Sequence, residues 1–477
     1  MMNGPLRKVS VFVALLMAAL LVNITYISVF RQDSMANEPR NRRVRDAEFS
    51  NKRGAILVGN EPIADSTESG SDRFPYERHY PEGNKWSSVT GWYSYDYARS
   101  NLEQSWNKEL SGTGSSQTFS RILDIVSGRS PHGANLNTSL HPGAQAAAIN
   151  ALGDQQGAAI AMDYTTGEIL ALASTPTYDP NRLASLDLGS QRDAWAELLD
   201  APGDPLKNRA TREIFPPGST FKLVTSAAAL ESGMTPESKL AAPDSLPLPN
   251  SSHAMGNSTN CGGTEITLEK ALSTSCNTAF GNLGMDLGAE ELREMAEKFG
   301  FNSEPEIDFP STTSRFPDEL DEAQTALSAI GQYDVASSPL QMLQVTAAIA
   351  NDGVLMEPHI VSEVTGEDLR VISSNSPREL GRPMSASNAV QLQDMMVDVV
   401  ENGTGSPAQL SGMRIGGKTG TAQSAKDRPN YAWFVGFAEE PQVAVVAFVQ
   451  STSVESNDIS GGRVAAPIFR AVMEALR

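Results

Sequence analysis

Two kinds of residue that commonly bind metal ions are scarce in this sequence of 477 residues, which contains two cysteines and five histidines. Two cysteines cannot hold a metal by themselves and the histidines show no ligand spacing, so we expect no metal and no cofactor. Basic residues are also in deficit, because 37 Lys and Arg stand against 57 Asp and Glu. A nucleic-acid partner is therefore excluded, since little in the chain would neutralise phosphates. The length predicts two or three domains.

Charge is missing altogether from residues 9–30, a run of 22 largely apolar residues. At about 1.5 Å per residue, a helix of this length spans roughly 30 Å of hydrocarbon. A cleavable signal peptide has a shorter apolar core of about 7–15 residues, although the residues at 34–36 could serve as a cleavage site. The arginines that follow the run depart from the positive-inside rule, but long domains are translocated largely regardless of such charges. We expect a cytoplasmic tail over 1–8, a single-pass anchor in the cell membrane over 9–30, and an extracytoplasmic body.

The body divides into two parts of different character. Residues 31–144 are rich in charged, aromatic and loop-forming residues and contain no catalytic constellation, with short helices indicated only at 103–110 and 119–126. Residues 145–477 alternate helices with hairpin-connected strands, without the βαβ rhythm of a parallel sheet. We expect strands at 158–162, 169–174, 432–438 and 443–449, and helices at 145–152, 223–230, 268–272, 278–287, 340–350, 391–400 and 465–476. The second part is therefore predicted to be α+β, with an antiparallel sheet covered by helices.

Three short polar motifs lie in order along the second part: STFK at 219–222, SCN at 275–277 and KTGT at 418–421. Each motif is weak evidence when taken alone. The pattern S-x-x-K recurs at Ser105, and the pattern S-x-N recurs at Ser258 and Ser373. The residues around each copy must therefore show which copy belongs to a functional site.

Ser219 follows Phe-Pro-Pro-Gly, which ends any earlier element, and precedes the apolar helix expected at 223–230. It is predicted to lie at a helix N-terminus, where free backbone N–H groups can stabilise an oxyanion. Lys222 lies one turn further on the same face, within reach of the hydroxyl. A lysine can deprotonate serine only if burial or a nearby cation lowers its pKa. For S-x-x-K alone, an N-cap serine beside a solvated lysine is the ordinary alternative.

The KTGT motif follows two glycines and precedes the expected C-terminal strands. Such a strand offers the cation of Lys418 and the hydroxyls of Thr419 and Thr421. Because Gly420 has no side chain, it also allows a ligand to approach the backbone closely. The alternative is an edge strand that carries Lys418 as a protective charge.

In this order the three motifs resemble the penicillin-binding proteins and the serine β-lactamases. Further segments resemble class B penicillin-binding proteins almost continuously over 145–477: MDYTTGEILA at 162–171, PTYDPN at 176–181, SAIGQ at 328–332, GTG at 403–405 and WFVGFA at 433–438. Upstream, RGAI at 53–56 and RHYP at 78–81 resemble the non-catalytic pedestal of that class, although its usual D-R-N-G is replaced by LVGN at 57–60. The overall layout is similar to the actinobacterial penicillin-binding protein A type.

The resemblance implies a β-lactamase-like transpeptidase domain over 145–477, standing on a pedestal domain over 31–144. It implies a peptidoglycan D,D-transpeptidase that cross-links stem peptides through a Ser219 acyl-enzyme, releases D-Ala and is blocked covalently by β-lactams. It also implies partners, namely a membrane glycosyltransferase of the SEDS type and other division or elongation proteins. The residue roles it implies are Ser219 as nucleophile, Lys222 as base, Ser275 as proton relay and Lys418 as a charge near Ser275. For the substrate it implies Asn277 as a ligand of the amide, Thr419 and Thr421 at the terminal carboxylate, and Gly420 as a further substrate-binding residue. The N–H groups of Ser219 and Thr421 would form the oxyanion hole.

Other functions share part of this pattern. A class A β-lactamase needs a glutamate for deacylation, and no E-x-x-L-N segment lies between Ser275 and Lys418. A D,D-carboxypeptidase differs only in using water as the acceptor. A bifunctional class A protein needs a glycosyltransferase domain, which residues 31–144 are too few to form. A catalytically silent scaffold of the division machinery would not need intact motifs.

Cys261 and Cys276 fit either one disulfide or two spare thiols in an exported domain. Ser275 and Asn277 must both face the cleft, so the side chain of Cys276 between them points away and is free to bond. Cys261 lies in a polar, glycine-containing segment that suits a loop folding back over the motif. We expect the disulfide. The alternative is a buried free Cys276 with an exposed Cys261.

Overall fold

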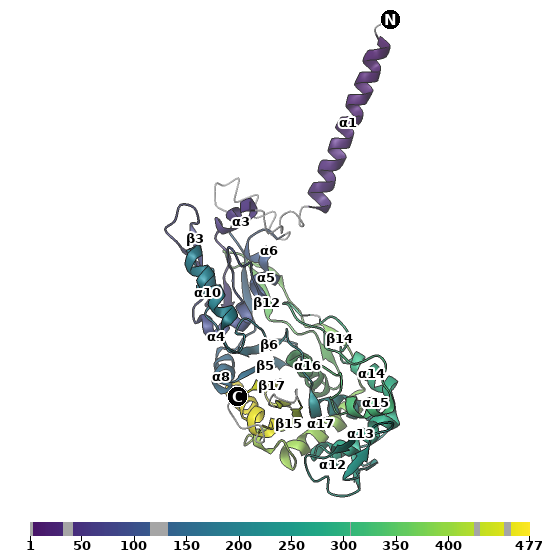
Figure 1. The fold of residues 1–477 in the computed structure, drawn as a ribbon. Coiled ribbons are helices and arrows are strands. Elements are labelled where there is room, and N and C mark those ends of the chain that lie inside the picture. Colours follow the sequence, from purple (N-terminus) through teal and green to yellow (C-terminus); the bar gives the residue numbers. More distant parts are fainter. Residues whose placement is uncertain (1–2, 32–41, 115–131, 306, 424–429, 453–458) are drawn as a thin grey trace.

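The computed structural model describes residues 3–31, 42–114, 132–305, 307–423, 430–452 and 459–477 (Figure 1). At the N-terminus, helix α1 (Asn3–Phe30) extends away from the rest of the chain. Within it, Arg7–Phe30 is long and apolar enough to cross a membrane, and no part of this stretch is buried against the body. The helix expected at 119–126 lies outside the described residues.

The pedestal is built on a sheet rather than on helices. In the described part of the chain its six strands lie in the order β13 (Val371–Ser374), β12 (Val361–Thr365), β4 (Asn135–Thr138), β1 (Ile56–Val58), β2 (Glu61–Glu68) and β3 (Tyr76–His79). A two-residue turn joins β1 to β2, because Val58 pairs with Glu61. Gly59 opens that turn with φ 59°, a conformation that glycine adopts without steric cost. The LVGN segment that departs from the class B pattern is therefore a strand and its hairpin turn.

Strands β12 and β13 come from residues 361–374, far beyond the pedestal in the sequence, and appear as green strands in its blue sheet (Figure 1). Helix α10 (Leu188–Asp200) also contacts the pedestal, since its Gln191 side chain accepts a hydrogen bond from the backbone N–H of Asp96 at 3.2 Å. The expected boundary between residues 144 and 145 falls within α8 (Pro142–Leu152), and the pedestal sheet is completed by residues 361–374, from beyond that boundary.

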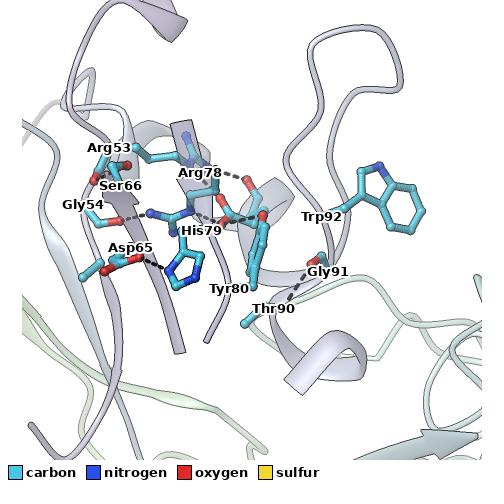
Figure 2. Close-up of polar contacts among 12 residues, drawn as sticks. Arg53, Gly54, Asp65, Ser66, Arg78, His79, Tyr80, Thr90, Gly91 and Trp92 are labelled. Atoms are coloured by element: carbon cyan, nitrogen blue, oxygen red, sulfur yellow. Dashed lines mark hydrogen bonds and ion pairs between the residues drawn. The ribbon is translucent and has the colours of Figure 1, made fainter. Parts of the chain in front are cut away.

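A buried charge cluster lies in the pedestal (Figure 2). Arg53 and Arg78 each donate through Nε to the carboxylate of Glu103, at 2.6 and 2.7 Å. Burial alone would raise the pKa of Glu103, but the two guanidinium groups outweigh it and hold the pKa below its usual value. Arg78 also donates to the backbone oxygen of Gly54 at 2.7 Å. The arginines of the RGAI and RHYP segments therefore share one buried carboxylate, which ties three separate segments together.

The second part contains the expected antiparallel sheet. Its five strands in the described ranges lie in the order β15 (Ile415–Ala422), β16 (Tyr431–Ala438), β17 (Val443–Ser451), β5 (Gln156–Asp163) and β6 (Ile169–Thr175). Alternate residues of β5 join different cores, because Ala158 and Ile160 pack in one cluster and Ala159 and Ala161 in another. Both faces of β5 are therefore buried, which explains why its central residues are continuously apolar.

Helices cover both faces of this sheet. Helices α8 (Pro142–Leu152) and α18 (Ala466–Leu476) pack together on one face. Helix α16 (Pro339–Ala350) packs on the other face, while α17 (Ala386–Glu401) packs against β15. The α+β prediction and its main helices are confirmed. Five further helices form a lobe beside β15 (Figure 1): α11 (Lys222–Glu231), α12 (Leu268–Ser273), α13 (Asn277–Leu287), α14 (Ala289–Lys298) and α15 (Glu322–Ser328).

Two helical segments differ from the expectation. Residues 83–90, which show little helical periodicity, form α4 (Gly83–Thr90), with Trp86 and Val89 buried. Tertiary burial stabilises this short helix in spite of its weak intrinsic propensity. The helix expected at 103–110 is divided at Trp106 into α5 (Asn101–Ser105) and α6 (Asn107–Leu110).

Candidate active site

Ser219 lies in a single 3₁₀ turn, η2 (Gly218–Phe221), which leads directly into α11. Gly218 has φ 54°, and a Cβ atom there would lie 2.9 Å from the backbone oxygen of Thr421. The backbone N–H of Gly218 donates to the oxygen of Gly331 at 2.9 Å. The Pro-Pro-Gly sequence therefore brings Ser219 close to β15. Only a glycine fits at position 218, because any side chain there would collide with the backbone of β15.

The SCN motif forms the turn between α12 and α13, and Ser275 has a left-handed backbone with φ 57°. Lys222 Nζ donates to the Ser275 backbone oxygen at 2.8 Å, to its hydroxyl at 3.2 Å and to Asn277 Oδ1 at 2.8 Å. Lys418 Nζ approaches the same hydroxyl at 2.9 Å. The structure thus brings residues of all three motifs together, with the Ser275 hydroxyl between two lysines.

Both lysines are fully buried, with 0% of each residue exposed. Burial, and then the charge of Lys418, hold the pKa of Lys222 well below its usual value. Burial also lowers the pKa of Lys418 to about 7. A buried amine that is readily neutral can accept a proton, which an exposed lysine at neutral pH cannot do. The arrangement therefore has the electrostatics that a lysine base requires.

Lys222 was expected within reach of the Ser219 hydroxyl. Among the hydrogen bonds of the described residues, none joins these two side chains. The Lys222 amine instead contacts Ser275 and Asn277. Catalytic hydrogen bonds are often long or poorly aligned before substrate binds, so a base need not be hydrogen-bonded to its serine in the free enzyme.

Ser219 opens into a cleft of about 790 Å³. Ser275, Asn277, Thr419 and Thr421 also line it, whereas Lys222 and Lys418 lie buried beneath its surface. Thr419 and Thr421 share one side of β15 because side chains alternate along a strand. The cleft therefore presents a nucleophile and several hydroxyls to a ligand, above two buried amines.

The lack of a side chain at Gly420 allows close packing within the protein. A Cβ atom there would lie 2.9 Å from Thr220 Cγ2 and 3.0 Å from the backbone oxygen of Pro217. Gly420 thus lets β15 pack directly against the segment that carries Ser219.

Sequence reasoning assigned no role to Thr404 or Tyr333, and both line the cleft. The Thr404 hydroxyl is hydrogen-bonded to that of Thr419 at 2.7 Å. The GTG segment at 403–405 signalled the first of these residues. No motif signalled Tyr333.

The other copies of the short motifs are not part of this arrangement. Ser105 ends α5 in the pedestal and Ser373 lies in β13. Ser258 does line the cleft, but both buried lysines converge on Ser275. Tertiary position, rather than the pattern itself, separates the copies.

A disulfide joins Cys261 to Cys276. The segment before Cys261 is further attached to the SCN turn, because Thr259 donates to the Thr274 backbone oxygen at 2.6 Å and Asn277 Nδ2 donates to that of Gly256 at 3.1 Å. Of the two alternatives for these cysteines, the structure contains the bond, which lies directly behind Ser275 and Asn277.

Removal of this bond by the double substitution Cys261→Ser and Cys276→Ala is expected to lower the free energy of unfolding by about 3 kcal/mol, the chain-entropy value for a 15-residue loop. The bond spans 15 residues. Acylation by benzylpenicillin should also slow, since the turn that carries Ser275 loses its covalent attachment. Denaturation curves and stopped-flow acylation measure the two effects. Titration of two thiols in the denatured, unreduced wild type would show that the bond does not form.

Residues 157–474 match the family model described as the penicillin-binding protein transpeptidase domain, and residues 53–136 match that of the penicillin-binding protein A dimerisation domain. The chain belongs to the class B penicillin-binding proteins, as the motifs and the fold predicted. It is 40% identical to the peptidoglycan D,D-transpeptidase PbpA of Mycolicibacterium smegmatis, over 99% of each chain. It is 39% identical to PbpA of Mycobacterium tuberculosis, again over 99% of each.

Solved structures agree with this assignment. The ceftriaxone acyl-enzyme of penicillin-binding protein A from M. tuberculosis superposes with a TM-score of 0.85 at 38% identity, covering 90% of this chain and 99% of that one. The penicillin G acyl-enzyme of the same protein gives a TM-score of 0.84 at 38% identity, covering 90% and 100%. The similarity therefore extends over the pedestal as well as the catalytic domain.

Proposed function

We propose that this chain is a membrane-anchored D,D-transpeptidase that cross-links peptidoglycan stem peptides through an acyl-enzyme on Ser219. The observation that carries the proposal is the Ser275 hydroxyl held between the buried amines of Lys222 and Lys418, in the cleft that Ser219 also lines. The relatives named as D,D-transpeptidases and those solved as β-lactam acyl-enzymes support the same reaction. β-Lactams are covalent inhibitors because they acylate the same serine.

In the first step, neutral Lys222 takes the proton of the Ser219 hydroxyl, and the oxygen attacks the carbonyl between the two D-Ala residues. The N–H groups of Ser219 and Thr421 receive the negative charge that develops on the carbonyl oxygen. Thr419 and Thr421 bind the terminal carboxylate, and Asn277 binds the substrate amide. Thr404 orients the Thr419 hydroxyl through their 2.7 Å hydrogen bond.

In the second step, the carbon–nitrogen bond breaks and D-Ala leaves as an amine. The proton now on Lys222 reaches that nitrogen through the Ser275 hydroxyl, which lies 3.2 Å from Lys222 and 2.9 Å from Lys418. Lys418 favours this transfer by polarising the hydroxyl. The acceptor amine of a second stem peptide then attacks the ester, its proton returns along the same route, and Ser219 is released as a new peptide bond forms.

The substrate lies outside the cell membrane, and this location determines the topology and the partners that we propose. Residues 1–8 form a cytoplasmic tail, Val9–Phe30 cross the membrane, and residues 31–477 lie outside, with the pedestal raising the catalytic domain above the membrane surface. An enzyme that only cross-links needs newly polymerised strands. A membrane glycosyltransferase of the SEDS type and other division or elongation proteins are the partners that would provide them.

Tryptic digestion after benzylpenicillin treatment tests the nucleophile. Cleavage after Arg212 and Lys222 yields the peptide of residues 213–222, in which Ser219 is the only serine, whereas Ser275 lies in the peptide of residues 271–293. We expect the penicilloyl adduct on residues 213–222, detected by mass spectrometry. The adduct should be absent in Ser219→Ala and still form, more slowly, in Ser275→Ala. An adduct elsewhere, or none in the wild type, would contradict the proposal.

A further inference from the structure

Tyr333 stands at the mouth of the active-site cleft in a backbone conformation that tyrosine rarely adopts. Its φ is 62°, in the left-handed region, where the Cβ atom of a bulky residue is crowded. Half of the residue is exposed, at 50%, and it lines the cleft that contains Ser219. A strained aromatic residue with half its surface in solvent contributes little to the core. Strain of this kind is often retained where a side chain serves a ligand.

Neighbouring backbone holds this turn in place independently of the tyrosine ring. The N–H groups of Gly331 and Gln332 donate to the backbone oxygens of Ser328 and Leu327, at 2.9 and 3.0 Å. Gly331 in turn accepts from Gly218, the residue before the nucleophile, at 2.9 Å. Tyr333 therefore belongs to a turn that is hydrogen-bonded to the Ser219 segment and has a fixed position beside the reaction centre.

The cleft has a mixed lining, in which hydroxyl groups come from β15 and Thr404 and other polar side chains include Asn430 and Arg463. Within it, one segment contributes apolar side chains, from Leu327 of α15 and from Ile330 and Tyr333 in the turn that follows. In the proposed function the carboxylate end of the donor peptide lies against the hydroxyls. The part of the donor that precedes the D-Ala pair is then left to the rest of the lining, in which the segment of Leu327, Ile330 and Tyr333 offers apolar contact to methylene groups.

We propose that Tyr333, with Leu327 and Ile330, recognises the methylene side chain of the donor residue that precedes the D-Ala pair, and so determines the preference for a diamino acid at that position. The inference rests on the proposed function. A tyrosine ring suits this task because its face covers methylene groups while its hydroxyl remains in water. Tyr333 acts in substrate selection and takes no part in proton transfer.

The test compares kcat/KM for release of D-Ala from Nα,Nε-diacetyl-L-Lys-D-Ala-D-Ala and from N-acetyl-L-Ala-D-Ala-D-Ala. The wild type should prefer the lysyl peptide, and Tyr333→Gly should reduce that preference by about tenfold, the range that apolar pockets give per methylene. The loss should appear mainly in KM. Tyr333→Asn should give the same loss without a more flexible turn, whereas Tyr333→Phe should keep the preference.

Stability separates recognition from a structural role. Glycine and asparagine tolerate the left-handed region, so Tyr333→Gly and Tyr333→Asn should melt no earlier than the wild type. Leu369→Gly is the matched control, because Leu369 has φ 61° and is 75% exposed in the pedestal hairpin between β12 and β13. It should leave the peptide preference unchanged. An unchanged preference in Tyr333→Gly, with Ser219 of the wild type still acylated by benzylpenicillin, would overturn this inference alone, whereas failed wild-type acylation would overturn the proposed function.

Discussion

Replacement of Lys222 by alanine is expected to slow acylation by benzylpenicillin by about 10²–10⁴-fold, the usual contribution of a positioned general base. The reason lies in the environment of the amine. Lys222 is completely buried, and burial together with Lys418 holds its pKa well below the usual lysine value. Second-order rate constants from stopped-flow mixing, with the fraction acylated read by mass spectrometry, measure the effect.

Lys222→Arg distinguishes a base from a fixed positive charge. Arginine keeps the charge but is not deprotonated in proteins, so this variant should be as slow as the alanine variant if the neutral amine takes the proton. An acylation rate close to that of the wild type would show that only the charge matters. Lys108→Ala, in the second copy of S-x-x-K, is the matched control and should acylate normally.

The pH dependence of acylation follows from the same groups. A base must be deprotonated to act, so the rate should fall as the pH drops through the lowered pKa of Lys222. Lys418, whose pKa burial lowers to about 7, also gains a proton as the pH falls and adds a second charge beside Ser275. The two titrations are coupled, so the acid limb reports the lysine pair rather than either residue alone. It should lie well below the range of an ordinary lysine.

The reactive residues of the site could be predicted from the sequence because they belong to short motifs. Ser219 and Lys222 are one helical turn apart, and Ser275 and Asn277 belong to one turn, so local geometry already places each pair. Their assembly into one site could not be derived locally, because the contacts of Lys222 and Lys418 with Ser275 span 53 and 143 residues. The resemblance to a family supplied that step. Local geometry also placed Lys222 beside Ser219, whereas the structure directs its amine to Ser275 and Asn277.

The pedestal was predicted least well, for a related reason. Its sheet includes β12 and β13, from residues 361–374. No local sequence pattern predicts that β12 pairs with β4, which lies more than 200 residues earlier. The helix α4 is short and has weak intrinsic propensity, so burial rather than periodicity stabilises it. The packing around Gly420 in the active site could not be predicted from local sequence either, because its neighbours Thr220 and Pro217 come from a distant segment.

The charge cluster of the pedestal leads to a second large expected effect. Glu103→Ala should lower the free energy of unfolding by about 3–5 kcal/mol, because the buried Arg78 loses the carboxylate with which it pairs and Arg53 keeps the longer pair with Glu48, at 3.6 Å. Glu103 is completely buried and accepts hydrogen bonds from Arg53 and Arg78 at 2.6 and 2.7 Å. Its lowered pKa gives the sign of the pH effect: the stabilisation is present above the unfolded pKa and is lost as the pH falls through the folded one.

Denaturant titration of the chain from residue 31 onward, followed by intrinsic fluorescence, measures the change. The matched control is Glu197→Ala, which breaks the solvent-exposed pair of Glu197 and Arg182 and should cost at most about 1 kcal/mol. Replacing Arg53, Arg78 and Glu103 together by apolar residues of similar size should restore much of the stability that Glu103→Ala removes, since no buried charge is then left unpaired. A Glu103→Ala protein as stable as the Glu197→Ala control would show that this cluster does not hold the pedestal together. A triple variant less stable than Glu103→Ala would show that Arg53 and Arg78 stabilise the fold even without Glu103, against the expectation that they are left poorly compensated.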